Sequence, residues 1–198
     1  MDVASALSGR VEADWCPHLA ILVPGEAAVV PALASFYGLG ARRNGWLFHR
    51  ALPGQSDVDR AALTGAGLDV AALEAGGRLA VAEPPLESDP ERWAKPWVPV
   101  AEDALARGFE AAWFSRFPIG PDEGRFSAAL AFDRAWDEAF HGRPAVSLCV
   151  YIVDEVDDGA RDERLAALAP MHDGVVVAGA GGAELIETRP AGGQPARR

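Results

Sequence analysis

Six short apolar runs, separated by longer segments with helical spacing, constrain the fold of this chain most strongly. They span residues 19–23, 46–48, 79–82, 111–114, 146–153 and 175–178, and glycine, proline or charged residues bound each of them. Most of the runs are apolar at successive positions, which is typical of strands that are covered on both faces. We expect the run from Val146 to Val153 to lie centrally.

The segments between the runs have the periodicity of amphipathic helices. One apolar stripe consists of Val29, Val30, Leu33, Phe36 and Tyr37. A second consists of Ala129, Leu130, Phe132, Trp136 and Phe140, with Asp133, Asp137 and Glu138 assigned to the remaining surface. Shorter helices are predicted over 57–63, 70–75, 98–107 and 162–169. Strands and helices alternate, which predicts a three-layer α/β/α sandwich with a mainly parallel sheet.

The composition excludes several classes of protein. The chain has 198 residues, of which 49% are hydrophobic, and a formal net charge of −11. An acidic body of this kind repels nucleic acid and anionic lipid, so direct binding to DNA or to a membrane is not expected. The apolar runs are far shorter than the ~20 residues of a membrane helix, and Met1-Asp2-Val3 is not the basic start of a signal peptide. With only two cysteines as well, we expect a cytoplasmic protein.

Four features resemble one known family of sensory domains. A histidine, His18, precedes the first apolar run, and the passage from Leu63 to Val81 has the order of a helix, Gly67-Leu68-Asp69-Val70, a short helix, and Gly77-Arg78-Leu79-Ala80-Val81. An alanine-rich helix then leads through Gly108-Phe109 into Ala111-Ala112-Trp113-Phe114, and a strand contains Leu148-Cys149-Val150-Tyr151. Residues 18–182 thereby resemble the MEDS domain, the sensory domain of methanogens, methylotrophs and the DcmR repressor.

This resemblance implies a RecA/KaiC-like core without a working P-loop. The only lysine, Lys95, lies outside any glycine loop, so a G-x-x-x-x-G-K-[ST] phosphate cradle is absent from the sequence. The resemblance also implies a sensor in prokaryotic signalling and transcription, here as a stand-alone chain. We expect an amino-terminal extension over 1–17, the MEDS-like domain over 18–188 and a disordered tail over 189–198. The chain departs from the family pattern at Val23-Pro24-Gly25-Glu26 and at Ser115-Arg116-Phe117-Pro118.

Polar side chains follow several of the predicted strands at their carboxyl ends, where ligands collect in parallel sheets. They are Glu26, His49, Arg50, Glu83, Arg116, Asp154 and Glu155. Arg50 and Arg116 are predicted to clamp an anion, with Glu83 or Asp154 holding the guanidinium groups. An ordinary rim of salt bridges is the alternative. Trp93 and Trp97, in a loop after the third strand, are predicted either to close over a ligand or to plug the top of the core.

Metal binding and covalent catalysis find little support in the sequence. Cys16 and His18 provide two ligands where zinc normally requires four, and the other cysteine, Cys149, lies in a buried strand. We therefore interpret His18 as a core or capping histidine and Cys149 as an inert core thiol. His49, His141 and His172 share no ligand spacing, and no G-x-S-x-G motif is present. Residues 179–182 predict a hairpin or turn rather than a phosphate loop. No metal, cofactor or catalytic residue is predicted.

The sequence therefore predicts a non-enzymatic sensory or regulatory domain. Its ligand would be a small molecule, or its partner a protein, bound at the carboxyl edge of the sheet. One alternative is a degenerate nucleotide-binding enzyme, a hydrolase or transferase, on a RecA-like fold. A further alternative is a pure protein-interaction module, such as a homodimer.

Overall fold

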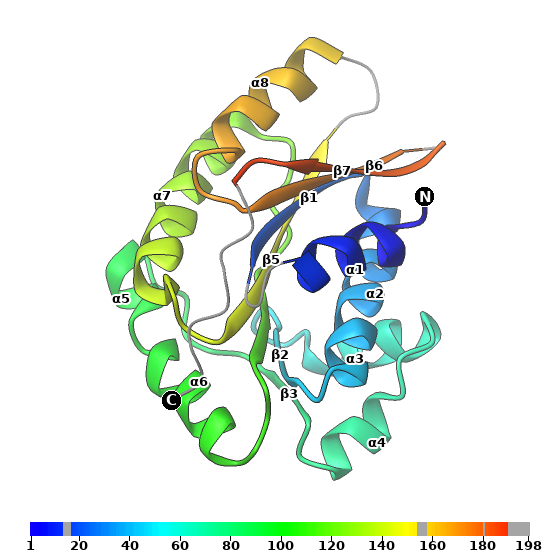
Figure 1. Cartoon of the computed structure of the whole chain (residues 1–198), viewed down its shortest axis with the longest axis vertical. Coiled ribbons are helices and arrows are strands. Elements are labelled where there is room, and N and C mark those ends of the chain that lie inside the picture. Colours follow the sequence, from blue (N-terminus) through cyan, green and yellow to red (C-terminus); the bar gives the residue numbers. More distant parts are fainter. Residues whose placement is uncertain (14–16, 154–157, 180, 190–198) are drawn as a thin grey trace.

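The computed structural model describes residues 1–13, 17–153, 158–179 and 181–189, and its centre is a sheet of seven strands in the order β3-β2-β4-β5-β1-β6-β7 (Figure 1). The strands are β1 (His18–Pro24), β2 (Trp46–Arg50), β3 (Leu79–Ala82), β4 (Ala112–Ser115), β5 (Ala145–Val153), β6 (Gly174–Gly179) and β7 (Gly182–Glu187). Neighbouring strands are parallel except for β6 and β7, which form an antiparallel hairpin. The six predicted apolar runs are β1 to β6, and the predicted hairpin leads into β7.

Helices cover both faces of the sheet, which confirms the predicted three-layer α/β/α sandwich (Figure 1). One face is covered by α1 (Val3–Ala13), α2 (Val29–Arg42), α3 (Ser56–Gly65) and α4 (Val70–Ala75). The other is covered by α5 (Pro90–Ala94), α6 (Trp97–Ala106), α7 (Glu123–Phe140) and α8 (Asp158–Leu168). A short 3₁₀ helix, η1 (Glu26–Ala28), joins β1 to α2.

Alternation along the strands divides the core into two halves. In β2, Leu47 packs toward α2, whereas its neighbours Trp46 and Phe48 pack toward α6. The central strand β5 is buried over eight of its nine residues, which explains why its sequence is apolar at almost every position. The two halves differ in chemistry. The α2 side is mostly aliphatic, whereas the α6 and α7 side contains a cluster of aromatic rings around Phe114 and Trp136.

Two segments are more regular than the sequence pattern indicated. Residues 3–13, within the expected extension and open to either a short helix or an edge strand, form α1, whose Leu7 and Val11 are buried in the same core as β1 and β6. Trp93 and Trp97, placed in a loop, lie instead in α5 and at the first residue of α6. The side chain of Asp89 caps α5 by accepting from two backbone amides, and Pro90 occupies its first turn, so a helix start was encoded there.

The two margins of the sheet are different. β3 forms one margin with only four residues and is followed by Glu83-Pro84-Pro85. β7 forms the other margin, and its Ala183 donates a backbone hydrogen bond to the carbonyl of Met1. No helix of the described residues is long and apolar enough to cross a membrane. The predicted disordered tail spans 189–198. Its first residue, Arg189, is described and forms an ion pair with Asp137, whereas residues 190–198 lie outside the described residues.

Candidate functional site

The pocket that the fold positions best lies between the carboxyl ends of β2 and β4. The connection after β2 runs to the face covered by α3, whereas the connection after β4 runs to the face covered by α7. Neighbouring strands whose connections leave in opposite directions form a crevice, which is where open α/β sheets bind their ligands. Arg50 ends β2, and Ser115 and Arg116 follow at the end of β4.

Aromatic rings and a few polar groups line this pocket. The aromatic residues are Phe48, Trp93, Trp97, Phe114 and Trp136, and the polar ones are Arg50, Ser115, Arg116 and Ser147. Leu148 and Cys149 complete the lining. The cavity measures about 20 Å³, which is room for about one water molecule. Trp93 of α5 and Trp97 of α6 form one side of it.

Arg50 is a buried cation without an acidic partner among the described residues. Its side chain donates one hydrogen bond to the carbonyl of Pro85, and its Nε is buried without a hydrogen-bond partner. The guanidinium carbon lies 5.5 Å from the ring centroid of Trp93 and 5.1 Å from that of Phe117, so aromatic faces provide part of its stabilisation. Burial, and then the charge of Arg116, lower the pKa of Arg50 to about 10.

Arg116 differs from Arg50 because its charge is compensated. It donates hydrogen bonds to the carbonyl of Ala129 and to the carboxylate of Asp133, which is fully buried in the middle of α7. Tyr151 donates to the other carboxylate oxygen of Asp133. Burial alone would raise the pKa of Asp133, but Arg116 and then His172 outweigh it and hold that pKa below its usual value. Asp133 therefore stays ionised inside the core.

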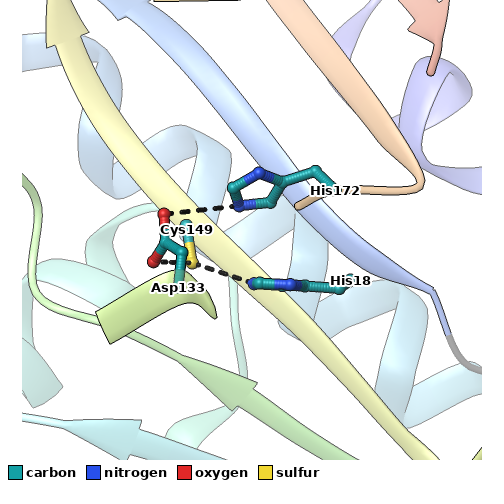
Figure 2. Close-up of side chains that lie close together, drawn as sticks. All are labelled: His18, Asp133, Cys149 and His172. Carbon is teal, nitrogen blue, oxygen red and sulfur yellow. Dashed lines mark hydrogen bonds and ion pairs between the residues drawn. The ribbon is translucent and has the colours of Figure 1, made fainter. Parts of the chain in front are cut away.

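Three further side chains surround Asp133 and form a polar cluster with it (Figure 2). The cluster consists of His18, Asp133, Cys149 and His172, and one candidate ligand atom from each lies within 4.8 Å of the others. All four are buried, and they come from β1, α7, β5 and the turn before β6. Burial raises the pKa of the Cys149 thiol well above its usual value, and the negative charge of Asp133 adds to that effect. Burial, and then His18, lower the pKa of His172 to about 3.

The remaining predicted residues are engaged elsewhere. His49 lies on the other side of β2. Its Nδ1 lies 3.2 Å from the hydroxyl oxygen of Tyr37, and its Nε2 donates to Asp59 Oδ2 over 3.0 Å. Glu83 does not hold a guanidinium group as predicted. Its carboxylate accepts from the backbone amides of Gly54 and Ser56 and so fixes the start of α3.

Among the described residues of the predicted rim, Arg50 and Arg116 line the pocket, together with Trp93 and Trp97. Glu26 is exposed in η1 and does not line it. Asp154 and Glu155 lie outside the described residues. The prediction that Asp133 lies on the surface is wrong, because Asp133 is fully buried.

The sequence did not predict that the four residues of the polar cluster lie together. His18 and Cys149 were each interpreted as isolated core residues, and both are indeed buried, but they lie beside each other, with 3.4 Å between His18 Nε2 and Cys149 Sγ. One signal was available for Asp133. It falls on the spacing of the buried stripe of α7, four residues after Ala129 and three before Trp136, both of which are buried.

The comparison with protein families decides which family this scaffold represents. Residues 17–169 match the model of "MEDS: MEthanogen/methylotroph, DcmR Sensory domain". The chain belongs to the MEDS family. The match spans every strand from β1 to β5, including the strand ends that form the pocket, and it begins one residue before His18. A comparison with curated proteins finds no match for this MEDS chain.

Two solved structures from Pyrococcus horikoshii resemble the MEDS chain in fold. One is an uncharacterized protein, PH0321, in complex with an unknown peptide; it has 16% identity and a TM-score of 0.52, with 87% of this chain and 84% of that chain covered. The other is the KaiC-like protein PH0186, with 14% identity and a TM-score of 0.51, covering 81% of this chain and 70% of that chain. The MEDS fold is therefore RecA/KaiC-like. The connection directly after β1 begins Gly25-Glu26-Ala27 and lacks the glycine-rich loop with a lysine that forms a P-loop.

Proposed function

We propose that this MEDS chain is a non-enzymatic ligand sensor that binds a small organic anion between Arg50 and the rings of Trp93 and Trp97. The family supports a sensory role, and the pocket lies at the crevice that this fold class uses for ligands. In this proposal the anion is a carboxylate on an apolar body, because a single cation faces a mostly aromatic lining. Binding would then be passed to a regulatory partner in signalling or transcription.

The observation that supports this proposal most directly is the uncompensated charge of Arg50. Burying a guanidinium group without a counter-ion costs free energy, and proteins rarely retain such a group unless something binds to it. Arg50 is 5% exposed, and no described acidic side chain forms an ion pair with it. A ligand carboxylate would supply the missing negative charge and accept from the free Nε.

Arg116 has a different role in this proposal from the one that the sequence predicted. Its guanidinium is already paired with Asp133, so it does not offer a free charge to a ligand. It forms the wall of the pocket, with its guanidinium carbon 5.8 Å from the ring centroid of Trp93. The clamp is thus formed by one arginine and two tryptophans rather than by two arginines.

In this proposal a ligand enters the pocket when α5 and α6, which we call the roof helices, move away from the sheet. Trp93 and Trp97 lie on α5 and α6, which follow a segment with Pro84, Pro85 and exposed Leu86. Trp93 is also packed against Phe132 and Trp136, so the roof is part of the aromatic cluster when closed. Opening it exposes tryptophan rings to water, which intrinsic fluorescence reports directly.

Calorimetry and tryptophan fluorescence with matched carboxylate and amide pairs test this proposal. The panel contains short aliphatic and aromatic carboxylates, and each is paired with its neutral amide. We expect at least one carboxylate to bind tenfold or more tightly than its amide and to shift the fluorescence, because charge-assisted hydrogen bonds require the anion.

One variant tests the role of Arg50 in binding, and a second variant is its control. Arg50→Gln removes the charge at the pocket and is expected to abolish the preference for the carboxylate. Arg92→Gln removes an exposed charge from the same helix as Trp93 and is expected to leave binding unchanged. Equal binding of carboxylate and amide, or full affinity in Arg50→Gln, contradicts the proposal. Magnesium-dependent turnover of ATP by the wild-type chain would instead favour the enzymatic alternative.

A further inference from the structure

Four buried side chains with metal-binding atoms gather beside the proposed anion pocket. They are His18, Asp133, Cys149 and His172, and one candidate ligand atom from each lies within 4.8 Å of the others (Figure 2). Three successive pairs of their atoms are 3.4 Å (His18 Nε2 to Cys149 Sγ), 3.3 Å (Cys149 Sγ to Asp133 Oδ1) and 3.5 Å (Asp133 Oδ2 to His172 Nε2) apart. Donor atoms around a tetrahedral zinc ion are separated by roughly 3.2 to 3.8 Å.

His172 presents an unpartnered ring nitrogen to this cluster. Its Nδ1 lies 2.9 Å from the carbonyl oxygen of Leu168, which can only accept, so Nδ1 is the donor. The neutral ring therefore has a lone pair on Nε2, and this atom is buried without a hydrogen-bond partner. It faces the carboxylate of Asp133, which is also an acceptor. Two acceptors that face each other in the core repel unless a proton or a metal ion lies between them.

His18 repeats this orientation. Its Nε2 faces Cys149, whereas its Nδ1 lies 3.9 Å from a carboxylate oxygen of Asp137. Asp137 is held in turn by a two-pronged contact with Arg189. In metal sites, a ligating histidine presents one ring nitrogen to the ion and the other to a carbonyl or carboxylate that orients the ring. His172 has this arrangement through the carbonyl of Leu168. His18 approaches it through a longer contact with Asp137, because its Nδ1 has no hydrogen-bond partner.

We propose that His18, Asp133, Cys149 and His172 bind a divalent transition-metal ion, with zinc as the preferred ion. One thiolate, two imidazoles and one carboxylate form a donor set that suits zinc and does not suit the hard cations Mg²⁺ and Ca²⁺. Binding breaks the S–H bond of Cys149 and forms a sulfur–metal bond. The proton leaves to solvent. The two negative ligands then balance the charge of the ion, and Arg116 and Tyr151 continue to orient Asp133.

The cluster and the anion pocket share a wall. Cys149 lines the pocket, and Arg116 lies between the pocket and Asp133. A metal ion in the cluster would therefore fix the position of both side chains. The metal site does not depend on the proposed anion, however, and its test uses no carboxylate, so either proposal can fail without the other.

Metal binding by the full chain tests the inference. The protein is stripped with a chelator and then titrated with Zn²⁺ against a chromophoric competitor, and with Co²⁺ while its absorption is recorded. We expect one zinc ion per chain. We also expect a cobalt spectrum with tetrahedral d–d bands and a thiolate-to-metal charge-transfer band, which reports sulfur ligation by itself. A Cys16→Ser background assigns that band to Cys149.

Matched variants locate the site. Cys149→Ser should abolish the charge-transfer band, and His172→Gln should weaken zinc binding by 100-fold or more. His141→Gln, which changes an exposed histidine, should bind zinc as the wild type does. Circular dichroism identifies any variant that does not fold, and the wild-type titration stands without the variants. A folded wild type that takes up no more zinc than His172→Gln, or a cobalt spectrum without a thiolate band, overturns the proposal.

Discussion

Arg116 and Asp133 form an ion pair that is almost completely closed to solvent, with exposed side-chain fractions of 8% and 0%. The pair joins the end of β4 to the middle of α7, and Tyr151 and Cys149 add two further donors to the same carboxylate. A buried pair of this kind contributes little net stability when it is compared with well-packed apolar residues. Removing one partner, however, leaves an uncompensated charge in the core.

We therefore expect Asp133→Asn to lower the free energy of unfolding by about 3–5 kcal/mol, because Arg116 then lacks its counter-ion. Urea denaturation at pH 7, with a chelator present to exclude metal effects, measures this loss. Glu138→Gln neutralises an exposed carboxylate on the same helix and should change the free energy by less than about 0.5 kcal/mol. A loss of similar size in both variants would contradict the buried ion pair.

For a substitution at Arg50 we expect the free energy of unfolding to increase. Because its buried charge has no acidic partner among the described residues, Arg50→Met should raise the free energy of unfolding by about 1 kcal/mol in the absence of ligand. Residues retained for binding are often destabilising in the free protein. Arg116→Met provides the comparison, since it breaks the pair with Asp133 and should be strongly destabilising. Thermal and urea unfolding should show changes of opposite sign in the free energy of unfolding of the two variants. If Arg50→Met is destabilised as much as Arg116→Met, Arg50 has a structural role and the prediction is wrong.

The pH dependence of stability should reflect His172. Burial, and then His18, lower its pKa from 6.5 to about 3, so the unfolded chain binds a proton between these values while the folded chain does not. Stability is then fully present above pH 6.5 and decreases as the pH falls toward 3. Between pH 7 and pH 5 the contribution of His172 is on the order of 2 kcal/mol. Urea midpoints of chelator-treated protein should fall over this range, and His172→Gln should reduce the slope whereas His141→Gln should not.

Gly40 tests the packing of α2 on the sheet. A Cβ at Gly40 would lie 2.7 Å from Leu47 Cδ2 and 2.7 Å from Trp113 Cδ2, both of which belong to fully buried side chains. Gly40→Ala should therefore cost about 1–3 kcal/mol through overpacking. Gly9→Ala is the matched control, because a Cβ at Gly9 in α1 meets nothing within 4 Å. That variant should instead stabilise the protein by up to about 1 kcal/mol, and differential scanning calorimetry distinguishes the two signs.

Local sequence pattern was sufficient for most of the fold. Continuous apolar runs indicated parallel strands with two covered faces, and β5 fits this description. The capping of α4 by Asp69 was also predictable, because a short polar side chain before a helix satisfies a free amide, here that of Ala72. These features depend on neighbours within a few positions. The order of the strands was not predicted, apart from the central place of the run from Val146 to Val153, which β5 confirms.

The polar cluster was not predictable in the same way. His18, Asp133, Cys149 and His172 come from four separate elements, and only the register of β1 with β5 brings the first strand beside Cys149. Asp133 is the instructive case. Its position in α7 follows the buried spacing, but its charge favoured the surface assignment, since an isolated carboxylate is rarely buried. Its partner Arg116, from the end of β4, reverses that preference.

The margins of the sheet restrict how this molecule meets another copy of itself. β3 has only four residues, and Pro84 and Pro85 after it have no amide hydrogen to offer an incoming strand. At the opposite margin, β7 includes Glu184 and Glu187, and the backbone of Met1 already occupies the amide of Ala183. Edge-to-edge polymerisation is thereby discouraged at both ends. An associating protein would meet helical surfaces instead, and among these α5 and α6 carry Trp93 and Trp97, which line the pocket.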